Sequence, residues 1–397
     1  MSREPNDEIR AALHEHLTWW GLRRFTSDAD YFAWQSKQLS PAELTQLNEQ
    51  VERKRRGDSR DEIAFYDLAA QPNILSVLYS QRYEYYREIG SRAASRVGDA
   101  NSILDFGCGV GILTTFYARR YPTKQFVGVD RSSASVTLAV EKADALGLRN
   151  VRFVCVDIEL ESLSGSCDLI IATHALVQAE HDPGIPSRSW RTFERTHDAY
   201  QQAAFEQRTG VGPRLDRLYP MLNEQGRMIL FEKTRQLARR VPFQRAVAAR
   251  GFQLIEIPES VRYQLVEEVA DDGPFYLLQK GCESSIGWDE APEPDGGVPF
   301  DRVALQRKSS DPGTPLYENH GPSAQHVWEK LADRKVMKET NRQESDGRQM
   351  HLEIGTTEDD AYLYCANTFD QRQLVIVDHP RLAMIETYYQ EIVGGMG

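Results

Sequence analysis

Acidic residues end three short apolar runs of this chain, and their type and spacing could bind a polar ligand. The acids are Asp105, Asp130 and Asp157, and the runs that they end or interrupt are residues 103–105, 125–130 and 151–157. Each run has the length and composition of a buried β-strand. Because the carboxyl ends of parallel strands meet at one edge of a sheet, we expect the three carboxylates to lie close together. They could accept hydrogen bonds from the hydroxyl and amino groups of a ligand.

A glycine-rich loop follows the first acid. Glycine stands at positions 107, 109 and 111, directly before a segment, 112–118, that can begin a helix. Glycine lets the backbone take unusual dihedral angles and lets a ligand approach without a Cβ in the way. The third glycine comes one position too early for the dinucleotide fingerprint, and Asp105 would repel a pyrophosphate. The loop therefore favours a cationic or zwitterionic ligand at a helix N-terminus.

Four stretches resemble the motifs of the class I S-adenosylmethionine-dependent methyltransferases. They are LDFGCGVG, VGVD, CVDIE and CDLIIATHAL, in the family's order and spacing, within residues 60–280. The resemblance implies an α/β fold with a Rossmann-like seven-stranded sheet, S-adenosylmethionine as cofactor and no metal. By the resemblance, Asp105 and the backbone around Gly107, Cys108 and Gly109 hold the methionine end of the cofactor, Asp130 holds the ribose, and Asp157 and Ile158 hold the adenine. Gly111 and Arg131 are further candidates for cofactor binding. The alternative is an α/β protein that binds another adenine nucleotide.

Three residues are candidates for chemistry at the methyl acceptor. His174 lies just past the predicted fourth strand, and an imidazole titrates near neutrality, so it is the first candidate for a general base. Glu232, at the end of the predicted fifth strand 228–232, is the second. Tyr66 with Asp67 resembles the Tyr-Asp pair that closes over the cofactor in many small-molecule methyltransferases. Each has a purely structural alternative: the histidine can bond a loop backbone, Glu232 can pair with a neighbouring cation, and Tyr66 can pack helices onto the sheet.

Composition excludes several classes of protein. The 397 residues carry a net charge of −12, which disfavours non-specific binding to nucleic acid or to an anionic membrane. The five cysteines show no paired CxxC spacing, so neither a disulfide framework nor a zinc site is indicated. No apolar run has membrane-spanning length. We expect a cytoplasmic protein.

The order of patterns along the chain predicts four parts. They are an N-terminal helical extension over 1–98, a methyltransferase domain over 99–281, a linker over 282–320 and a small α+β module over 321–397. A long insertion, 174–225, which contains His181, leaves the ligand side of the sheet and should build the acceptor pocket. In the module we expect a helix at 323–340, strands at 350–354, 361–366 and 373–377, and a closing helix. The module is a candidate for acceptor recognition or for homodimer formation.

The predicted function is methyl transfer to a small-molecule acceptor. The acceptor is acidic if the cations Lys233, Arg235, Arg239 and Arg240 face the pocket; the alternative is that they form a solvated helix face. Two other functions stay open. One is a protein or peptide methyltransferase that captures its substrate through the C-terminal module, and the other is a regulatory protein that binds S-adenosylmethionine without turnover.

Overall fold

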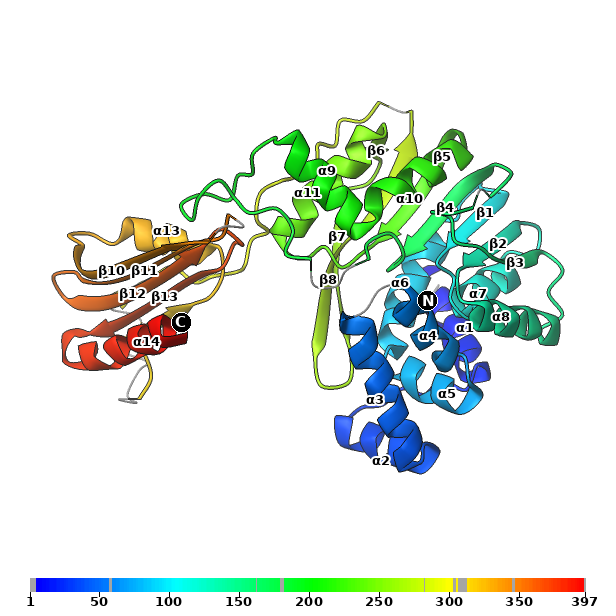
Figure 1. Ribbon diagram of the computed structural model, residues 1–397, viewed down its shortest axis with the longest axis horizontal. Coiled ribbons are helices and arrows are strands. Elements are labelled where there is room, and N and C mark those ends of the chain that lie inside the picture. Colours follow the sequence, from blue (N-terminus) through cyan, green and yellow to red (C-terminus); the bar gives the residue numbers. More distant parts are fainter. Residues whose placement is uncertain are drawn as a thin grey trace. The chain divides into compact units, whose positions relative to one another are not determined.

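The chain divides into two compact units in the computed structural model (Figure 1). The structure describes residues 5–56, 59–161, 163–178, 182–281, 283–302, 305, 313–344 and 347–395. The first unit contains residues 1–182, 206–235 and 243–288, and the second contains 183–205, 236–242 and 289–397. The predicted methyltransferase domain had included residues 183–205 and 236–242, which lie in the second unit together with residues 289–302 and 313–320 of the predicted linker.

A mixed sheet forms the centre of the first unit. Its strands are β1 (Ser102–Phe106), β2 (Gln125–Asp130), β3 (Val151–Cys155), β4 (Cys167–Thr173), β5 (Leu222–Phe231), β6 (Phe252–Leu254), β7 (Glu259–Gln264) and β8 (Val269–Lys280). The order is β3-β2-β1-β4-β5-β8-β6, and β7 pairs with β8. Strands β1 to β5 are parallel, whereas β8 runs antiparallel to β5. The predicted Rossmann-like α/β fold is confirmed.

The sheet has eight strands where the resemblance implied seven. The additional strand is β7, which forms a hairpin with the first half of β8, while β6 pairs with its second half. β8 is 12 residues long, which is enough for both pairings.

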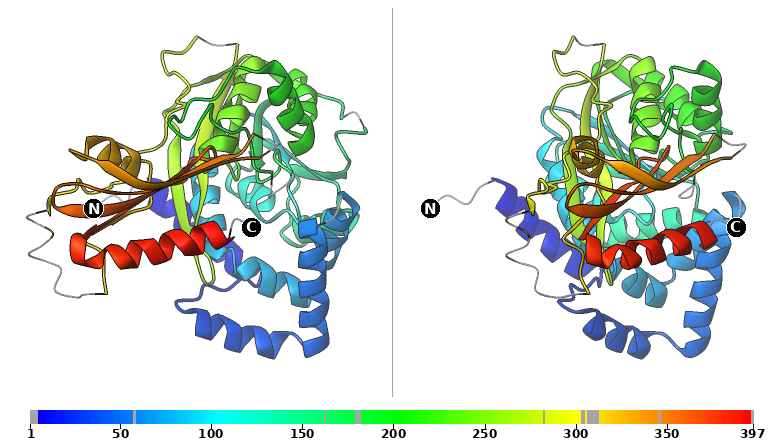
Figure 2. Two further views of the ribbon diagram at one scale, coloured as in Figure 1. Left: turned by 60° about the vertical axis from the view of Figure 1, so that its left-hand side comes forward. Right: turned by 90° about the vertical axis from the view of Figure 1, so that its left-hand side faces the viewer.

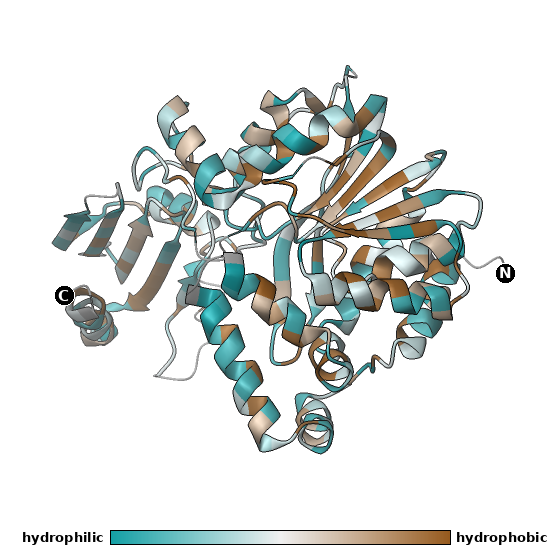
Figure 3. Ribbon diagram, turned by 45° about the vertical axis from the view of Figure 1, so that its right-hand side comes forward, coloured by the Kyte–Doolittle hydropathy of each residue, from teal (hydrophilic) through white to brown (hydrophobic). Residues whose placement is uncertain are grey.

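Helices cover both faces of this sheet, whose strands are largely hydrophobic (Figure 3). Those that connect its strands are α7 (Ile112–Arg120), α8 (Ser133–Ala145), α9 (Ala199–Thr209), α10 (Val211–Leu218), the short η1 (Tyr219–Met221) and α11 (Leu237–Ala249). Parallel strands that are buried on both faces read as continuous apolar runs, which is why β1 and β4 were recognisable from the sequence.

The described residues before the first strand are largely helical, as the pattern of the first hundred residues predicts. The helices are α1 (Pro5–Trp19), α2 (Asp28–Gln38), α3 (Pro41–Arg56), α4 (Ser59–Ala69), α5 (Pro72–Ser80) and α6 (Tyr83–Ser95). Leu13 of α1 and Ile89 of α6 are fully buried in the same core as β1 and α7. A separate apolar cluster around Tyr31 and Trp34 holds α2 to α5. The extension is thus continuous with the core of the first unit.

The second unit contains a five-stranded antiparallel sheet with the order β10-β11-β12-β13-β9. The strands are β9 (Tyr317–Asn319), β10 (Lys335–Gln343), β11 (Gln349–Thr356), β12 (Asp360–Asn367) and β13 (Arg372–Asp378). The helices are α13 (Ser323–Lys330), η2 (His379–Arg381) and α14 (Leu382–Gly395), and α13 and α14 lie on opposite faces of the sheet (Figure 2). Side chains alternate along β12, so that Leu363 packs with α14 and Tyr364 packs on the face that α13 covers.

Two predictions for this module were wrong. The helix expected over 323–340 ends at Lys330, because Leu331 is extended and Asp333 has a φ of 51°. The chain then reverses into the edge strand β10. The linker expected over 282–320 contains β9, which pairs with β13 through residues 317–319.

Part of the long insertion packs within the second unit. Trp190 stacks on His351 with ring centroids 3.7 Å apart, and the Ser187 N–H donates to the Thr368 carbonyl at 2.8 Å. Arg195, which is 2% exposed, pairs with Asp370. Residues 183–205 therefore belong to the second unit, where Ser187, Trp190 and Arg195 anchor them to the C-terminal sheet.

No helix in the described part of the chain is both long enough and apolar enough to cross a membrane. Within the same residues, no group of three or more histidine, cysteine or acidic side chains is arranged to hold a metal ion.

Candidate functional site

A pocket opens at the carboxyl ends of β1 to β4 in the first unit. It encloses about 1150 Å³ of space between atoms, part of which is open to solvent. Of the predicted site residues, the lining includes Tyr66, Asp105, Gly107, Cys108, Gly109, Asp130, Arg131, Asp157, Ile158 and His174. Gly111 and Glu232 are not among the lining residues.

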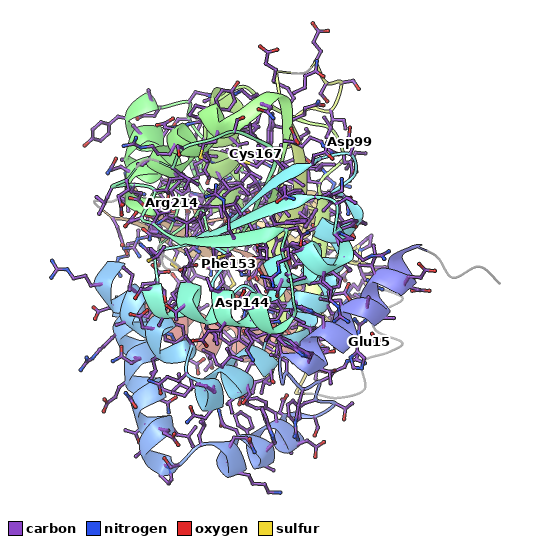
Figure 4. The ribbon with its side chains drawn as sticks, turned by 90° about the vertical axis from the view of Figure 1, so that its right-hand side faces the viewer. Glu15, Asp99, Asp144, Phe153, Cys167 and Arg214 are labelled. Carbon is purple, nitrogen blue, oxygen red and sulfur yellow. The ribbon has the colours of Figure 1, made fainter. Side chains whose placement is uncertain are left out.

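The glycine loop between β1 and α7 has left-handed backbone at all three glycines, with φ of 72° at Gly107, 54° at Gly109 and 82° at Gly111. A Cβ on Gly107 would lie 2.4 Å from the Cβ of Ala175, and one on Gly111 would lie 2.9 Å from a ring carbon of Phe153, labelled in Figure 4. A Cβ on Gly109 would meet nothing within 4 Å. Gly107 and Gly111 are thus required for packing, whereas Gly109 leaves open space for a ligand.

Asp105 lies at the base of the pocket and is 5% exposed. Thr114 Oγ1 donates to its Oδ2 at 2.5 Å. Burial raises the pKa of Asp105 to about 7, and the nearby Asp130 adds to the shift. The Tyr117 hydroxyl, which also lines the pocket, is buried without a hydrogen-bond partner among the described residues. A cationic ligand group would stabilise the ionised carboxylate, and the hydroxyl is available to a polar ligand atom.

Asp130 ends β2, and its carboxylate connects two loops. Gly109 N–H donates to Oδ2 at 2.8 Å, and Ser132 N–H donates to Oδ1 at 2.9 Å. Burial raises the pKa of Asp130 while these two backbone donors oppose the shift. A carboxylate has about four acceptor positions, so the group can accept further bonds from a diol. The adjacent Arg131 pairs with Glu62 of α4.

Asp157 and Ile158 follow β3. Asp157 Oδ1 accepts from the Glu159 N–H at 3.0 Å, and Ile158 is 3% exposed. This pair offers one carboxylate beside an apolar surface, the combination that an adenine amino group and ring would require.

Tyr66 and Asp67 of α4 have different positions. Tyr66 lines the pocket, and its hydroxyl accepts from Lys54 Nζ at 3.2 Å. Asp67 accepts from the Ser132 hydroxyl at 2.7 Å, which ties α4 to the start of α8. The predicted pair therefore comprises one residue of the pocket wall and one anchor behind it.

Glu232 is directed away from the pocket lining. It is 1% exposed, and its carboxylate accepts from the N–H groups of residues 175, 176 and 177 at 2.9, 2.8 and 3.3 Å. Burial raises its pKa to about 7 against these three bonds. Arg214 of α10, labelled in Figure 4, donates to the carbonyls of residues 175 and 176, at 2.9 Å each. Glu232 thus holds the backbone of the loop after β4. In this arrangement its carboxylate does not face the pocket, where the predicted role as a second candidate base would require it.

His174 begins that loop with a φ of 54°. Its Nδ1 is 2.5 Å from an Arg82 nitrogen, and its Nε2 is 3.1 Å from Asp272 Oδ2. The ring is stacked between Tyr85 and Phe231, with centroids at 4.9 and 5.2 Å. Burial lowers the pKa of His174 to about 4. Both ring nitrogens have protein neighbours, so His174 has no lone pair free for a substrate proton in this arrangement, and its role as a base stays a prediction.

Sequence reasoning missed several lining residues, notably Arg82, Tyr85 and Arg214. Arg82 precedes α6 among other tyrosines and arginines, and nothing in its local sequence separates it from them. The cations of 233–240 do not line the pocket: Arg235 pairs with Asp271, and Arg240 pairs with Glu293. His181 lies outside the described residues.

Comparison with known proteins agrees with this geometry. Residues 103–189 match a family model described as a methyltransferase domain. The chain is similar to trans-aconitate 2-methyltransferase of Deinococcus radiodurans, 38% identical over 88 residues, which are 22% of this chain and 32% of the relative. It is similar to a malonyl-[acyl-carrier protein] O-methyltransferase of Acetivibrio thermocellus, 26% identical over 148 residues, which are 31% of this chain and 51% of the relative. It is also similar to a tRNA (guanine-N(7)-)-methyltransferase of Rubrobacter xylanophilus, 36% identical over 90 residues, 22% of this chain and 40% of the relative.

The chain spans between about a third and a half of the length of these relatives. The shared part is the region of the glycine loop and the strand-end acids. The residues fit S-adenosylmethionine, since three features line one pocket. They are the open backbone at Gly109, the Asp105 carboxylate with its pKa of about 7, and Tyr117, whose hydroxyl has no hydrogen-bond partner among the described residues. The sheet order and the glycine loop agree with the match of residues 103–189 to a methyltransferase domain, and in these features the chain resembles the class I S-adenosylmethionine-dependent methyltransferases.

Proposed function

We propose that this protein transfers a methyl group from S-adenosylmethionine to a small-molecule acceptor. The observation that carries the proposal is the meeting of Asp105, Asp130 and Asp157 with the open Gly109 backbone around one pocket. The cofactor supplies an already electrophilic methyl carbon. The protein then mainly has to align the acceptor and exclude water.

In this proposal, Asp105 and the backbone of residues 107–109 hold the methionine end. Asp130 with Arg131 holds the ribose, and Asp157 with Ile158 holds the adenine. Tyr66 closes the pocket from the side of α4.

The acceptor of a small-molecule enzyme has to reach the pocket past α4 and the loop after β4. That loop is held by Glu232 from one side and Arg214 from the other, so its position does not depend on a ligand. Residues 175 and 176, held in this way, can form one wall of a pocket for a small acceptor. The net charge of −12 also favours a small acceptor over tRNA, although one relative bears the name of a tRNA methyltransferase.

The test uses the full chain and methyl-labelled S-adenosylmethionine with three separated acceptor fractions: small molecules, bulk tRNA and protein. We expect label in the small-molecule fraction, and much less with the Asp130→Ala variant at a cofactor concentration below the dissociation constant of the wild type. Label in the tRNA or protein fraction would contradict the small-molecule acceptor and identify that polymer as the acceptor. Cofactor binding without transfer to any fraction would favour the regulatory alternative.

The four predicted parts, the cytoplasmic location and a homodimer through the C-terminal module stay proposals. A sedimentation measurement on the full chain, with and without S-adenosylhomocysteine, tests the dimer.

A further inference from the structure

Arg82 is a pocket cation without a counter-ion. It is the residue before α6, and its guanidinium lies over the Tyr85 ring, 4.5 Å from the centroid. Among the described residues, its side chain is hydrogen-bonded to His174 Nδ1. Across the residues that the structure describes, no carboxylate lies within ion-pair distance of Arg82. The two other pocket arginines are both paired, Arg131 with Glu62 and Arg214 with Glu159.

The neighbouring arginines of the same helix show how unusual this is. Each of them binds at least one glutamate: Arg87 binds Glu84 and Glu88, Arg92 binds Glu88 and Glu259, and Arg96 binds Glu256. Charged side chains removed from bulk water are normally paired. A guanidinium has five N–H donors, so most of those of Arg82 remain for a ligand.

The surroundings fix the direction of this side chain. His174 Nε2 is 3.1 Å from Asp272 Oδ2, and the Tyr263 hydroxyl donates to the same oxygen. Since burial keeps His174 neutral near pH 7, its Nδ1 can accept from Arg82, and the ring proton then lies on Nε2, 3.1 Å from Asp272 Oδ2. Arg82 is thereby held through one guanidinium nitrogen, and the other N–H groups of its guanidinium remain for a ligand.

The position of Arg82 separates it from the expected cofactor contacts. The three acids stand at the ends of β1, β2 and β3, on one side of the pocket. Arg82 contacts His174, which follows β4, and Tyr85, whose hydroxyl donates to Thr173 at the end of β4. Tyr85 and His174 also contact Phe231, at the end of β5. In the sheet order β3-β2-β1-β4-β5, Arg82 lies on the far side of β1 from Asp130 and Asp157.

We propose that Arg82 binds a carboxylate of the methyl acceptor, and that His174 is a positioning residue which holds Arg82 for this contact. A planar carboxylate matches the guanidinium fork and carries one negative charge, which one unpaired cation balances. A phosphate would bring close to two negative charges to the same single cation. The inference rests on the proposed methyl transfer and names the acceptor class, a small carboxylic acid.

The experiment measures binding to the full chain saturated with S-adenosylhomocysteine, by calorimetry. The probes are trans-aconitate, malonate and 4-hydroxybenzoate, each compared with its neutral amide, and inorganic phosphate as the second oxyanion. We expect at least one acid to bind about tenfold or more tightly than its amide, since charge-assisted hydrogen bonds are roughly twice as strong as neutral ones. Arg82→Gln should reduce that preference to about twofold or less. Arg87→Gln, one turn along the same helix and outside the pocket, should leave it unchanged.

Two variants of His174 test the positioning role. His174→Asn keeps an acceptor oxygen and tolerates a positive φ, so we expect it to retain the preference for the acid. His174→Phe keeps an aromatic ring between Tyr85 and Phe231 but has no acceptor for Arg82, so the preference should be lost. Affinity for S-adenosylhomocysteine should stay within about twofold in both, and thermal melting shows that each is folded.

Several results would overturn the inference. They are no acid preferred over its amide, phosphate preferred over every acid, or a His174→Phe variant that retains the preference. If Arg82→Gln weakens the binding of S-adenosylhomocysteine about tenfold but leaves the binding of 5′-methylthioadenosine unchanged, Arg82 binds the carboxylate of the cofactor and not that of the acceptor. If the wild-type protein does not bind S-adenosylhomocysteine, the proposed function itself fails, and this is seen before any acid is added.

Discussion

The affinity for S-adenosylhomocysteine should rise with pH because of Asp105. Its pKa in the empty pocket is raised to about 7, so at about pH 5.5 nearly all molecules carry a neutral acid there. The proposed ligand group at this position is an ammonium, which favours the ionised carboxylate. Binding at low pH therefore has to remove a proton from Asp105, and this costs free energy.

The size of the effect follows from the pKa. The apparent dissociation constant is multiplied by one plus the ratio of neutral to ionised Asp105. This factor is about 33 at pH 5.5 and about 2 at pH 7, which gives a roughly 16-fold gain in affinity, about 1.6 kcal/mol. Above about pH 7.7 the amino group of the ligand begins to lose its own proton, so the range of the measurement ends near pH 7.

Calorimetry in two buffers of different ionisation enthalpy measures both affinity and proton release. We expect nearly one proton released per ligand at about pH 5.5 and about half a proton at pH 7. Asp105→Asn keeps an acceptor for the Thr114 hydroxyl but cannot ionise, so its affinity should be lower and nearly constant over the range. The ligand control is 5′-methylthioadenosine, which lacks the ammonium and should show no gain. A flat wild-type profile without proton release would refute the placement of the ammonium at Asp105.

Three other predictions follow from single contacts. Asp130→Ala should weaken the binding of S-adenosylhomocysteine more than about tenfold by calorimetry, because charge-assisted bonds to the ribose are lost. The control is Asp144→Ala, at an exposed acid on α8 labelled in Figure 4, which should leave the affinity unchanged. Equal affinities in the two variants would show that Asp130 does not bind the ligand. Burial raises the pKa of Glu232 to about 7 from an ordinary 4.5, so the folded protein holds the proton of this side chain more tightly than the unfolded chain does. The contribution of Glu232 to the free energy of unfolding should therefore fall by about 3 kcal/mol as pH rises from about 4.5 to 7. Urea titrations should show this fall reduced in Glu232→Gln, and an unchanged pH dependence would contradict the buried ionisation. Gly111→Ala should lower the free energy of unfolding by about 2–4 kcal/mol, measured by thermal melting, since φ is 82° and the new Cβ would meet Ala139 and Phe153. Gly147→Ala, at φ 66° with no atom within 4 Å of the new Cβ, should lower it by only about 1 kcal/mol. Similar losses in the two variants would mean that the packing around Gly111 is loose.

The sequence by itself determined the strands and the loop that make up the cofactor side of the pocket. Each buried strand is a continuous apolar run, and each strand-end acid is adjacent to its strand, so their common edge follows from parallel pairing alone. The three glycines of 107–111 also have local meaning, because positive φ is a property of the single residue. These features depend on residues a few positions apart, which is the range over which sequence patterns are informative.

Tertiary structure alone decided the acceptor side. His174 and Glu232 stand at strand ends as predicted, but their partners are Arg82, Asp272 and the loop backbone, which come from distant parts of the chain. A histidine whose Nδ1 accepts from an arginine has a different role from one that faces substrate, and no local pattern distinguishes the two. The same holds for residues 183–205, where Trp190 stacks on a histidine 161 positions away. Such pairings arise only when separate segments dock, because the free energy that selects them comes from burial and charge between those segments and not from the conformational preferences of either one.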